Sequence, residues 1–385
     1  MILSVVIVSY QVKFFLEQCL SSLKKALDGN EQLRSQSEVL IVDNASRDGT
    51  VEFLQTIYPG FQFICNTDNR GFAQANNQAL RICQGEFVLF LNPDTILAED
   101  SLSACLTFFA HHRDAGALGV HMVDGRGRYL KESKRGFPNP VASFFKMTGF
   151  IHLFPRSKLF SAYYQGHLDP KSSHPVDVLS GAFMMVKKAV IDQVGGFDEQ
   201  FFMYAEDIDL SWRIRKAGFT NYYFSETSII HFKGGSTKKD FRYVKMFYTA
   251  MDQFMKKHFV KTRSGAQMFL IRSGMRMHQV LAFLQIPFHS SSPQSRAPVP
   301  VFIKGNPDSS FLFRQKLETM GIPMTEKESA GVEIIYLEGS GLSWKSIIAE
   351  MIRNKVRYRY RFHGSGTHAA VGSDSAGDPG KFLVL

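Results

Sequence analysis

The first hundred residues contain four apolar runs of the kind that form buried strands, each followed directly by polar residues. Ligands of parallel sheets bind at the carboxyl ends of the strands, so these polar residues are the first candidates for chemistry. One such residue alone is more often structural, for example in an Asx turn, but four groups together are difficult to explain in that way. The candidates are Ser9 with Tyr10, Asp43, Arg70 within Asn66–Gly71, and Asn92 with Asp94.

A further group of acidic residues, Glu206, Asp207 and Asp209, lies at the start of a predicted helix. A helix N-terminus stabilises negative charge, so the group has a purely structural explanation. Asp209 and Arg213 are four residues apart and are expected to pair along the helix. This pairing leaves Glu206 and Asp207 available to face a site.

These candidates need a sheet to bring them together, and the pattern of the chain predicts one. Runs typical of strands at 4–8, 38–42, 61–65 and 87–91 alternate with helical spacing at 13–27, 51–57, 72–83 and from about residue 100. Such alternation predicts an α/β fold with a Rossmann-like, mostly parallel sheet and helices on both faces. The irregular stretch 129–176, rich in Pro, Phe, Lys and Ser, is expected to form a long loop or flap over the site.

A Ser/Pro-rich segment, 287–300, is the clearest domain boundary. Beyond it we expect a small α/β unit with strands at 299–303, 332–337 and 356–362 and helices at 311–320 and 344–354. This unit contains no group of residues typical of catalysis, so assembly or partner contact is its expected role. The predicted organisation is a catalytic domain at 1–260, a basic and apolar helix with the linker at 261–297, and a small domain at 298–385.

The formal net charge of +10 requires a negatively charged partner but does not identify it. Basic residues dominate 231–278, with Phe and Met interleaved at helical spacing. One interpretation is a solvated helix packed back on the domain, and the other is peripheral contact with an anionic membrane. Four cysteines without metal-type spacing, no signal peptide and no long apolar run predict a cytoplasmic protein.

Four motifs resemble a known family when they are taken in order. SVVIVSYQ, VDNASRDGT, NRGFAQANNQAL and LFLNPDT resemble successive motifs of the family 2 glycosyltransferases, which are inverting enzymes with a GT-A fold. The similarity is strongest to the bacterial rhamnosyltransferase-type members. It continues through LSGAFMMVKKAVIDQVGGFDEQFFMYAEDIDLSWRIRKAGF to HFKGGS and so covers residues 1–260. The resemblance implies a GT-A fold, a nucleoside-diphosphate sugar donor and an acceptor hydroxyl.

The resemblance also implies roles in donor binding. Asp43 would accept hydrogen bonds from the base of the nucleotide, with Ser9 and Tyr10 lining the same pocket. Arg70 would bind the diphosphate or the base side of the site, because a guanidinium suits phosphate. Gly181, which has no side chain, would let the backbone approach a sugar. The remaining donor-binding candidates are Asn76, Asn77 and Asn92.

The family pattern further implies metal ligands and a general base. Asp94 takes the place of the second carboxylate of the DXD-type motif and would bind Mg²⁺ or Mn²⁺ on the diphosphate. His231 matches a histidine that supplies a further metal ligand, although a histidine at a strand end is often structural. Asn92 replaces the first aspartate of the motif, so this site has one carboxylate fewer. Asp207, the second residue of the ED motif, would be the general base, with Glu206 supporting it or binding the acceptor.

Several other functions are disfavoured. A nucleotidyltransferase or a Rossmann dehydrogenase would need a glycine-rich loop after the first strand, and SVVIVSYQV contains no glycine. A nucleic-acid binder would not place Asp43, Asp94, Glu206 and Asp207 in its site, so no nucleic acid is expected. The alternative that stays open is a catalytically inactive scaffold or sugar-binding protein, although Asp94 and Asp207 are both present.

The resemblance favours dTDP-rhamnose as the donor, with UDP-sugars as the alternative. A glycan or a lipid-linked glycan is the expected acceptor, in the biosynthesis of a cell-surface polysaccharide. Such an acceptor would suit peripheral binding to the inner face of the cell membrane.

Overall fold

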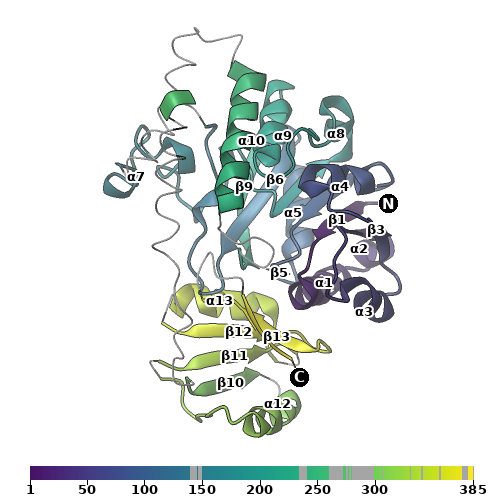
Figure 1. Ribbon diagram of the computed structural model, residues 1–385, viewed down its shortest axis with the longest axis vertical. Coiled ribbons are helices and arrows are strands. Elements are labelled where there is room, and N and C mark those ends of the chain that lie inside the picture. Colours follow the sequence, from purple (N-terminus) through teal and green to yellow (C-terminus); the bar gives the residue numbers. More distant parts are fainter. Residues whose placement is uncertain are drawn as a thin grey trace.

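The computed structural model confirms an α/β fold built around a large curled sheet (Figure 1). The described residues are 1–138, 145, 150–233, 241–259, 272–274, 276, 279, 299–305, 307–329, 331–339, 341–354, 357–374 and 380–384. The predicted basic segment and linker at 261–297 lie largely outside them. The predicted domain division at 260 and 298 therefore stays a prediction.

The large sheet has nine strands in the order β3-β2-β1-β4-β8-β6-β9-β5, with β7 also paired to β9. The strands β3, β2, β1 and β4 are parallel, and β8 then runs antiparallel to β4 and β6. β6 and β9 are parallel, whereas β5 and β7 are antiparallel to β9. The strands are β1 (Leu3–Ser9), β2 (Ser37–Asp43), β3 (Gln62–Cys65), β4 (Phe87–Leu91), β5 (Thr95–Leu97), β6 (Ala115–Val123), β7 (His174–Val176), β8 (Phe183–Lys187) and β9 (Thr220–His231).

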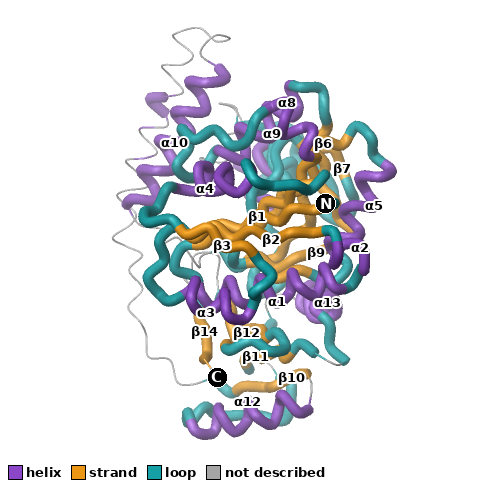
Figure 2. The backbone as a smooth tube through the Cα atoms, turned by 90° about the vertical axis from the view of Figure 1, so that its right-hand side faces the viewer, coloured by secondary structure: helices purple, strands orange, loops and turns teal. Residues whose placement is uncertain are grey.

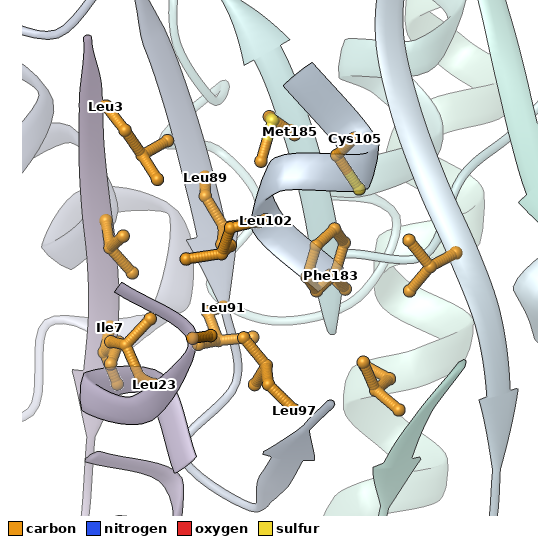
Figure 3. Packing of buried hydrophobic residues seen from close by; sticks show 14 of the residues in the cluster. Leu3, Ile7, Leu23, Leu89, Leu91, Leu97, Leu102, Cys105, Phe183 and Met185 are labelled. Atoms are coloured by element: carbon orange, nitrogen blue, oxygen red, sulfur yellow. The ribbon is translucent and has the colours of Figure 1, made fainter. Parts of the chain in front are cut away.

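Helices cover both faces of this sheet, because its central strands are apolar on both sides. In β1, Val5 and Ile7 belong to one core cluster, and Val6 and Val8 belong to another. Figure 3 shows part of the first cluster, where Leu102 packs among side chains of the sheet. The helices are α1 (Lys13–Asp28), α2 (Glu31–Ser35), α3 (Thr50–Ile57), α4 (Gly71–Leu80), α5 (Ser101–His111), α8 (Lys188–Val194), α9 (Glu206–Lys216) and α10 (Phe241–Phe259).

The predicted irregular stretch at 129–176 contains only short elements where it is described. They are η1 (Lys131–Ser133), α7 (Phe150–Leu153), η2 (Ala162–Tyr164) and β7. The start of the stretch is fixed by an isolated antiparallel bridge between Arg135 and Val178, which leads into β8. Residues 139–144 and 146–149 lie outside the described part of the stretch, apart from Phe145.

The basic helix α10 packs back on the domain, which is the first of its two predicted interpretations. Ala250, Phe254 and Met255 are buried in a cluster that includes Phe201 and Ile208. The polar end of the helix is tied down by ion pairs of its Lys257 with Asp198 and Asp209. None of the described helices combines the length and apolarity that a membrane span needs.

The C-terminal unit is a second sheet of five strands in the order β10-β11-β12-β13-β14. Its first three strands are parallel, and β13 and β14 are added antiparallel. Figures 1 and 2 place α13 on the side of this sheet that faces the nine-stranded sheet and α12 on the far side. The elements are β10 (Val301–Gly305), α12 (Pro307–Thr319), β11 (Glu333–Leu337), α13 (Trp344–Asn354), β12 (Arg359–His363), β13 (Ala369–Gly372) and β14 (Lys381–Val384).

Candidate active site

Buried polar side chains gather at the carboxyl ends of β1 and β2, a place called the base pocket below after its predicted ligand. Ser9 and Asp43 are register partners in the parallel pair. Asp43 accepts a hydrogen bond from the Ser46 backbone at Oδ2 (2.8 Å). Asp43 Oδ1 and Ser9 Oγ are buried without a hydrogen-bond partner in the described part of the chain. Buried polar atoms without partners are costly, so both atoms suit hydrogen bonds to a ligand. Tyr10 lies next to them, half-buried.

The N-terminus of α4 joins this pocket to the loop before α9. The Asn44 side chain donates to the Gly71 carbonyl (3.1 Å), and the Phe72 backbone donates to the Phe202 carbonyl (2.8 Å). Gly71 has φ +79°, and a Cβ atom there would lie 2.5 Å from the Phe202 carbonyl oxygen. Only glycine fits this close approach. Arg70, just before it, pairs with Asp68 (3.4 Å), and its side chain stays 36% exposed.

Asn76 and Asn77 lie one turn further along α4 and are occupied by protein partners. The Asn76 side chain is buried and donates to the Phe72 carbonyl in its own helix (2.9 Å). The Asn77 amide donates to the Phe197 carbonyl (2.8 Å) and accepts from the Phe197 backbone nitrogen (2.9 Å). In this structure Asn77 therefore holds the loop that precedes α9.

Asn92, Asp94 and His231 converge at the turn between β4 and β5. His231 Nε2 lies 3.3 Å from the Asn92 side-chain nitrogen and 3.4 Å from Asp94 Oδ1. Two strands hold this arrangement, because Thr95 of β5 pairs with His231 of β9. Asp94 and His231 are both buried, at 5% and 7% exposure. Residues 137 positions apart in the sequence are thus neighbours, as a shared ligand would require.

This corner fits a Mg²⁺ or Mn²⁺ ion that is shared with a diphosphate. One carboxylate, one imidazole and one amide offer oxygen and nitrogen ligands. The residues that the structure describes contain no cluster of three or more His, Cys, Asp or Glu side chains that could hold a metal alone. A magnesium-type ion usually takes one or two carboxylates and completes its coordination with substrate phosphates and water, so Asp94 and His231 are the side chains that would hold it.

Asp207 lies at the start of α9 and is held by three hydrogen bonds. Its Oδ2 atom accepts from the Arg135 guanidinium (2.5 Å) and from the Gly181 backbone (3.2 Å). Its Oδ1 atom accepts from the Ile208 backbone (2.8 Å). The predicted pairing of Asp209 with Arg213 is confirmed at 2.7 Å, and Asp209 also contacts Lys257 and His258 of α10.

Comparison with known proteins decides the family. Residues 4–195 match the model described as Glycosyl transferase family 2. N-acetylglucosaminyl-diphospho-decaprenol L-rhamnosyltransferase of Mycobacterium tuberculosis is 33% identical over 255 residues, which cover 62% of this chain and 78% of that protein. This chain belongs to glycosyl transferase family 2. The resemblance seen in the sequence is confirmed, and the protein is a glycosyltransferase.

Two further proteins are similar to this glycosyltransferase. Rhamnosyltransferase WbbL of Escherichia coli K12 is 27% identical over 221 residues, covering 54% of this chain and 78% of that protein. The crystal structure of Staphylococcus aureus TarS residues 1–349 has a TM-score of 0.47 and 19% identity. That match covers 76% of this chain and 73% of the TarS chain.

The two carboxylates of the ED motif have different environments in the glycosyltransferase. Burial, and then the negative charge of Asp207, raise the pKa of Glu206 to about 8. Glu206 Oε2 is buried and has no hydrogen-bond partner among the described residues. Asp207 instead has the Arg135 cation against it. At neutral pH Glu206 is therefore mostly protonated and can donate a hydrogen bond, which a carboxylate cannot.

Arg135 is the site residue that the sequence did not predict. Its side chain is only 13% exposed, and it also donates to the Leu179 carbonyl (2.9 Å). Burial alone would lower the pKa of Arg135, but the Asp207 carboxylate raises it instead. Arg135 lies 72 residues before Asp207, within the irregular stretch, and follows no predicted strand. No local pattern could therefore have indicated it.

A continuous set of contacts links Asp207 to the corner formed by Asn92, Asp94 and His231, called the metal corner below after its predicted ligands. Asp207 accepts from the Gly181 backbone, and Gly181 precedes Ala182. The Ala182 carbonyl accepts from the Asn92 backbone (3.0 Å), and Asn92 lies beside His231. The structure thus brings together Asn92, Asp94, Gly181, Asp207 and His231. Ser9, Asp43 and Arg70 form the neighbouring part of the same sheet edge.

Proposed function

We propose that this glycosyltransferase moves a sugar from a nucleoside-diphosphate donor to an acceptor hydroxyl with inversion at the anomeric carbon. The observation that carries the proposal is the contact path from Asp207 through Gly181 and Asn92 to Asp94 and His231. Such a path keeps a carboxylate base close to the place where a diphosphate would be held. The pocket at Asp43 and Ser9 adds a place for the base of the nucleotide.

In this proposal the donor lies along the carboxyl ends of β1, β2 and β4. Asp43 Oδ1 accepts a hydrogen bond from the base, Ser9 and Tyr10 line the pocket, and Arg70 approaches the diphosphate. Rhamnose is our first choice for the transferred sugar, because two similar proteins are named as rhamnosyltransferases. The nucleotide is then dTDP, with UDP as the second candidate.

Asp94 and His231 would hold Mg²⁺ or Mn²⁺ in this proposal, with Asn92 beside them. The ion, when bound, neutralises negative charge on the diphosphate as it departs. The carboxylate and the imidazole keep the diphosphate end of the donor at the β4–β5 turn. A Cβ atom on Gly181 would lie 3.5 Å from Asp207 Cβ and 3.8 Å from the Phe72 ring, so a side chain at this position would occupy the space beside the proposed base.

Asp207 would act as the general base in a single displacement. The acceptor oxygen forms a bond to the anomeric carbon while the bond from that carbon to the diphosphate breaks. The proton of the acceptor hydroxyl moves to the Asp207 carboxylate, and the nucleoside diphosphate leaves with the bonding electrons. Glu206, mostly protonated at neutral pH, would bind the acceptor through a hydrogen bond.

The acceptor in this proposal is a glycan or a lipid-linked glycan used to build a cell-surface polysaccharide. The similar protein from Mycobacterium tuberculosis is named for a diphospho-decaprenol substrate, which is such a lipid. The net charge of +10 would favour peripheral contact with an anionic membrane surface where this acceptor resides. The protein would then work at the inner face of the cell membrane.

Turnover of a donor panel tests the proposal. Release of nucleoside diphosphate from dTDP-rhamnose, UDP-N-acetylglucosamine and GDP-mannose is measured with Asp207→Asn and with the surface control Asp192→Asn. We expect Asp207→Asn to lower kcat by about 10²–10⁴-fold, because the amide cannot accept the proton. The control should match wild type, since the Asp192 side chain is 60% exposed and its ion pair within the described residues is with Lys188 in the same helix, α8. Equal activity of Asp207→Asn and wild type would refute Asp207 as the base.

A further inference from the structure

The strand that carries His231 has its other face turned away from the site. Ile230 in β9 and Phe232, just after its last residue, pack in one apolar cluster, whereas His231 between them faces Asn92 and Asp94. Ile230 and Phe232 are both buried, at 0% and 1% exposure, and Ile96 of β5 lies with them. Phe232 is also tied to the metal corner through its backbone, which donates to the Asp94 carbonyl (3.0 Å). Phe232 thus links Asp94 and His231 to the part of the protein that packs on this face of the strand.

The C-terminal unit covers it. Ile96, Ile230 and Phe232 share one core cluster with Trp344 of α13 and Phe362 of β12. The Phe232 ring lies 5.6 Å from the Phe362 ring and 5.1 Å from the Phe15 ring, measured between centroids. Figure 1 shows this unit below the end of the nine-stranded sheet where β5 lies. A part of the chain beyond the family match therefore packs directly behind the metal corner.

Polar contacts fix the C-terminal unit in this position. The Glu99 carboxylate accepts from the backbone nitrogens of Trp344 (2.6 Å) and Lys345 (2.9 Å), the first residues of α13. The buried Gln18 amide donates to Thr367 Oγ1 and accepts from the Gly364 backbone. Buried and satisfied polar contacts of this kind specify one arrangement of two packed units.

The turn after β6 lies close against the backbone of the C-terminal unit. A Cβ atom on Gly125 would lie 2.8 Å from the Ser373 carbonyl oxygen, and one on Gly127 would lie 2.4 Å from the Met351 carbonyl oxygen. The backbones of the two units thus approach within contact distance. Packed interiors transmit displacement because they have few voids. A shift of the C-terminal unit would therefore move Phe232.

His231 lacks the second hydrogen bond that usually orients a metal-binding histidine. Its Nδ1 atom is buried and has no partner within the described ranges of the chain. Its Nε2 atom lies close to Asn92 and Asp94. The packing of β9 must therefore hold the ring in place, and on this strand that packing is provided by Ile230 and Phe232.

We infer that the C-terminal unit, residues 301–384, is a fixed support for the metal-binding corner, and that Phe232 and Phe362 are its positioning residues. The inference rests on the proposed function, because it concerns the ligands of the proposed metal. It gives the last part of the chain a role in donor binding. Without the Phe362 ring, Phe232 gains freedom, and His231 and Asp94 no longer keep the spacing that an ion requires.

Calorimetry of nucleotide binding tests the support. UDP and dTDP are titrated, with Mn²⁺ and with EDTA, into full-length wild type, Phe362→Ala and Phe362→Leu. The matched control is Leu317→Ala, because Leu317 is equally buried in the C-terminal unit but lies in a cluster on the opposite face of its sheet. Thermal denaturation of each variant shows that it is folded at the titration temperature.

We expect Phe362→Ala to weaken Mn²⁺-dependent nucleotide binding by about tenfold or more, as the loss of outer-shell partners does in metal sites. In EDTA, where wild type loses its tight binding, Phe362→Ala and wild type should not differ. With Mn²⁺, Phe362→Leu should recover most of the affinity, and Leu317→Ala should leave it unchanged. Equal effects of Phe362→Ala and Leu317→Ala, or no effect of either, would overturn the support while leaving the proposed function intact. Wild type that binds no nucleotide with Mn²⁺ would instead overturn the proposed metal site and the support together.

Discussion

The Glu206–Asp207 pair places two adjacent carboxylates in opposite environments. Glu206 is buried beside a negative charge, whereas Asp207 contacts a guanidinium and a backbone amide. In the proposed function this contrast would separate a hydrogen-bond donor, Glu206, from the general base, Asp207. Burial is the main cause of the raised pKa of Glu206, and Arg135 is the cation that contacts Asp207 directly.

We expect Arg135→Met to lower kcat by about 10–100-fold, because Asp207 loses both a hydrogen bond and its orientation. Arg135→Lys keeps the positive charge but loses the planar guanidinium group, which also donates to the Leu179 carbonyl. It should therefore recover only part of the activity. The measurement is kcat, KM and their pH profile. The control is Arg215→Met, which removes a surface partner of Asp177. If the pH profile of Arg135→Met is unchanged and the control loses kcat equally, the effect of Arg135 is only structural.

Glu206 predicts a pH-dependent stability. Its pKa is raised to about 8 from the ordinary value of 4.5, so between these values the folded protein binds the proton that the unfolded chain releases. Wild type must therefore lose stability as pH rises through this window. Glu206→Gln cannot ionise and should show a smaller fall in Tm from about pH 5 to about pH 9. Thermal denaturation measures Tm against pH for both proteins over this range. Equal slopes would contradict a raised pKa of Glu206 in the folded protein.

Much of the site could be predicted from residue types and their position after strands. Asp43, Asn92 and Asp94 follow continuous apolar runs, and the parallel sheet brings those strand ends together. Asn77 shows the limit of this reasoning, because its amide binds the Phe197 backbone 120 residues away. Arg135 shows the same limit, because an irregular stretch has no helical or strand periodicity from which the contacts of a residue can be predicted.

Helices and strands could be predicted where their apolar residues follow one clear pattern. The runs that became β1, β2 and β4 were predicted to within one residue at each end, because they are apolar on both faces. β6 was missed, and it contains Gly116 and Gly119, which weaken a strand pattern. In the structure Gly116 is required by packing, since a Cβ atom there would lie 2.6 Å from Phe219 Cβ. β13 and β14 were missed because each is only four residues long.

The start of α4 gives a prediction at the scale of elements. Gly71→Ala should destabilise the protein by about 1–3 kcal/mol, because the residue has φ +79° and the new methyl group would collide with the Phe202 carbonyl. The collision would also move the loop that leads to Glu206, so nucleotide binding should weaken. Gly60→Ala is the control, since nothing lies within 4 Å of its Cβ position. Urea denaturation measures both, and equal midpoints would contradict the close approach.

At the scale of the whole molecule, one hydrophobic cluster joins the nine-stranded sheet to the five-stranded sheet. It contains Phe15 and Phe232 as well as Trp344 and Phe362. The sequence indicated a small α/β unit after a Ser/Pro-rich segment but not this contact. The sequence could not predict this contact, because it depends on which faces of β9 and α13 meet. The apolar face of α13 indicated burial but not the surface that covers it.

Shared packing predicts one cooperative unfolding transition. Gln18→Ala should lower the stability of the whole chain by about 1–3 kcal/mol, because it leaves buried partners in the C-terminal unit without hydrogen bonds. Gln55→Ala, on an exposed face of α3, is the control. Calorimetry should show a single transition for wild type and a lower Tm for Gln18→Ala. Two separate transitions in wild type, with only one moved by Gln18→Ala, would contradict a shared core.

The most direct test of the central claim is nucleotide binding by wild type and Asp94→Ala. Calorimetry with dTDP, UDP and GDP, each with Mn²⁺ and with EDTA, reports on the base pocket and the metal corner at once. We predict that one nucleotide binds tightly with Mn²⁺, and that EDTA or Asp94→Ala removes this binding while Asp192→Ala keeps it. Binding of no nucleotide by wild type under any of these conditions would contradict the account.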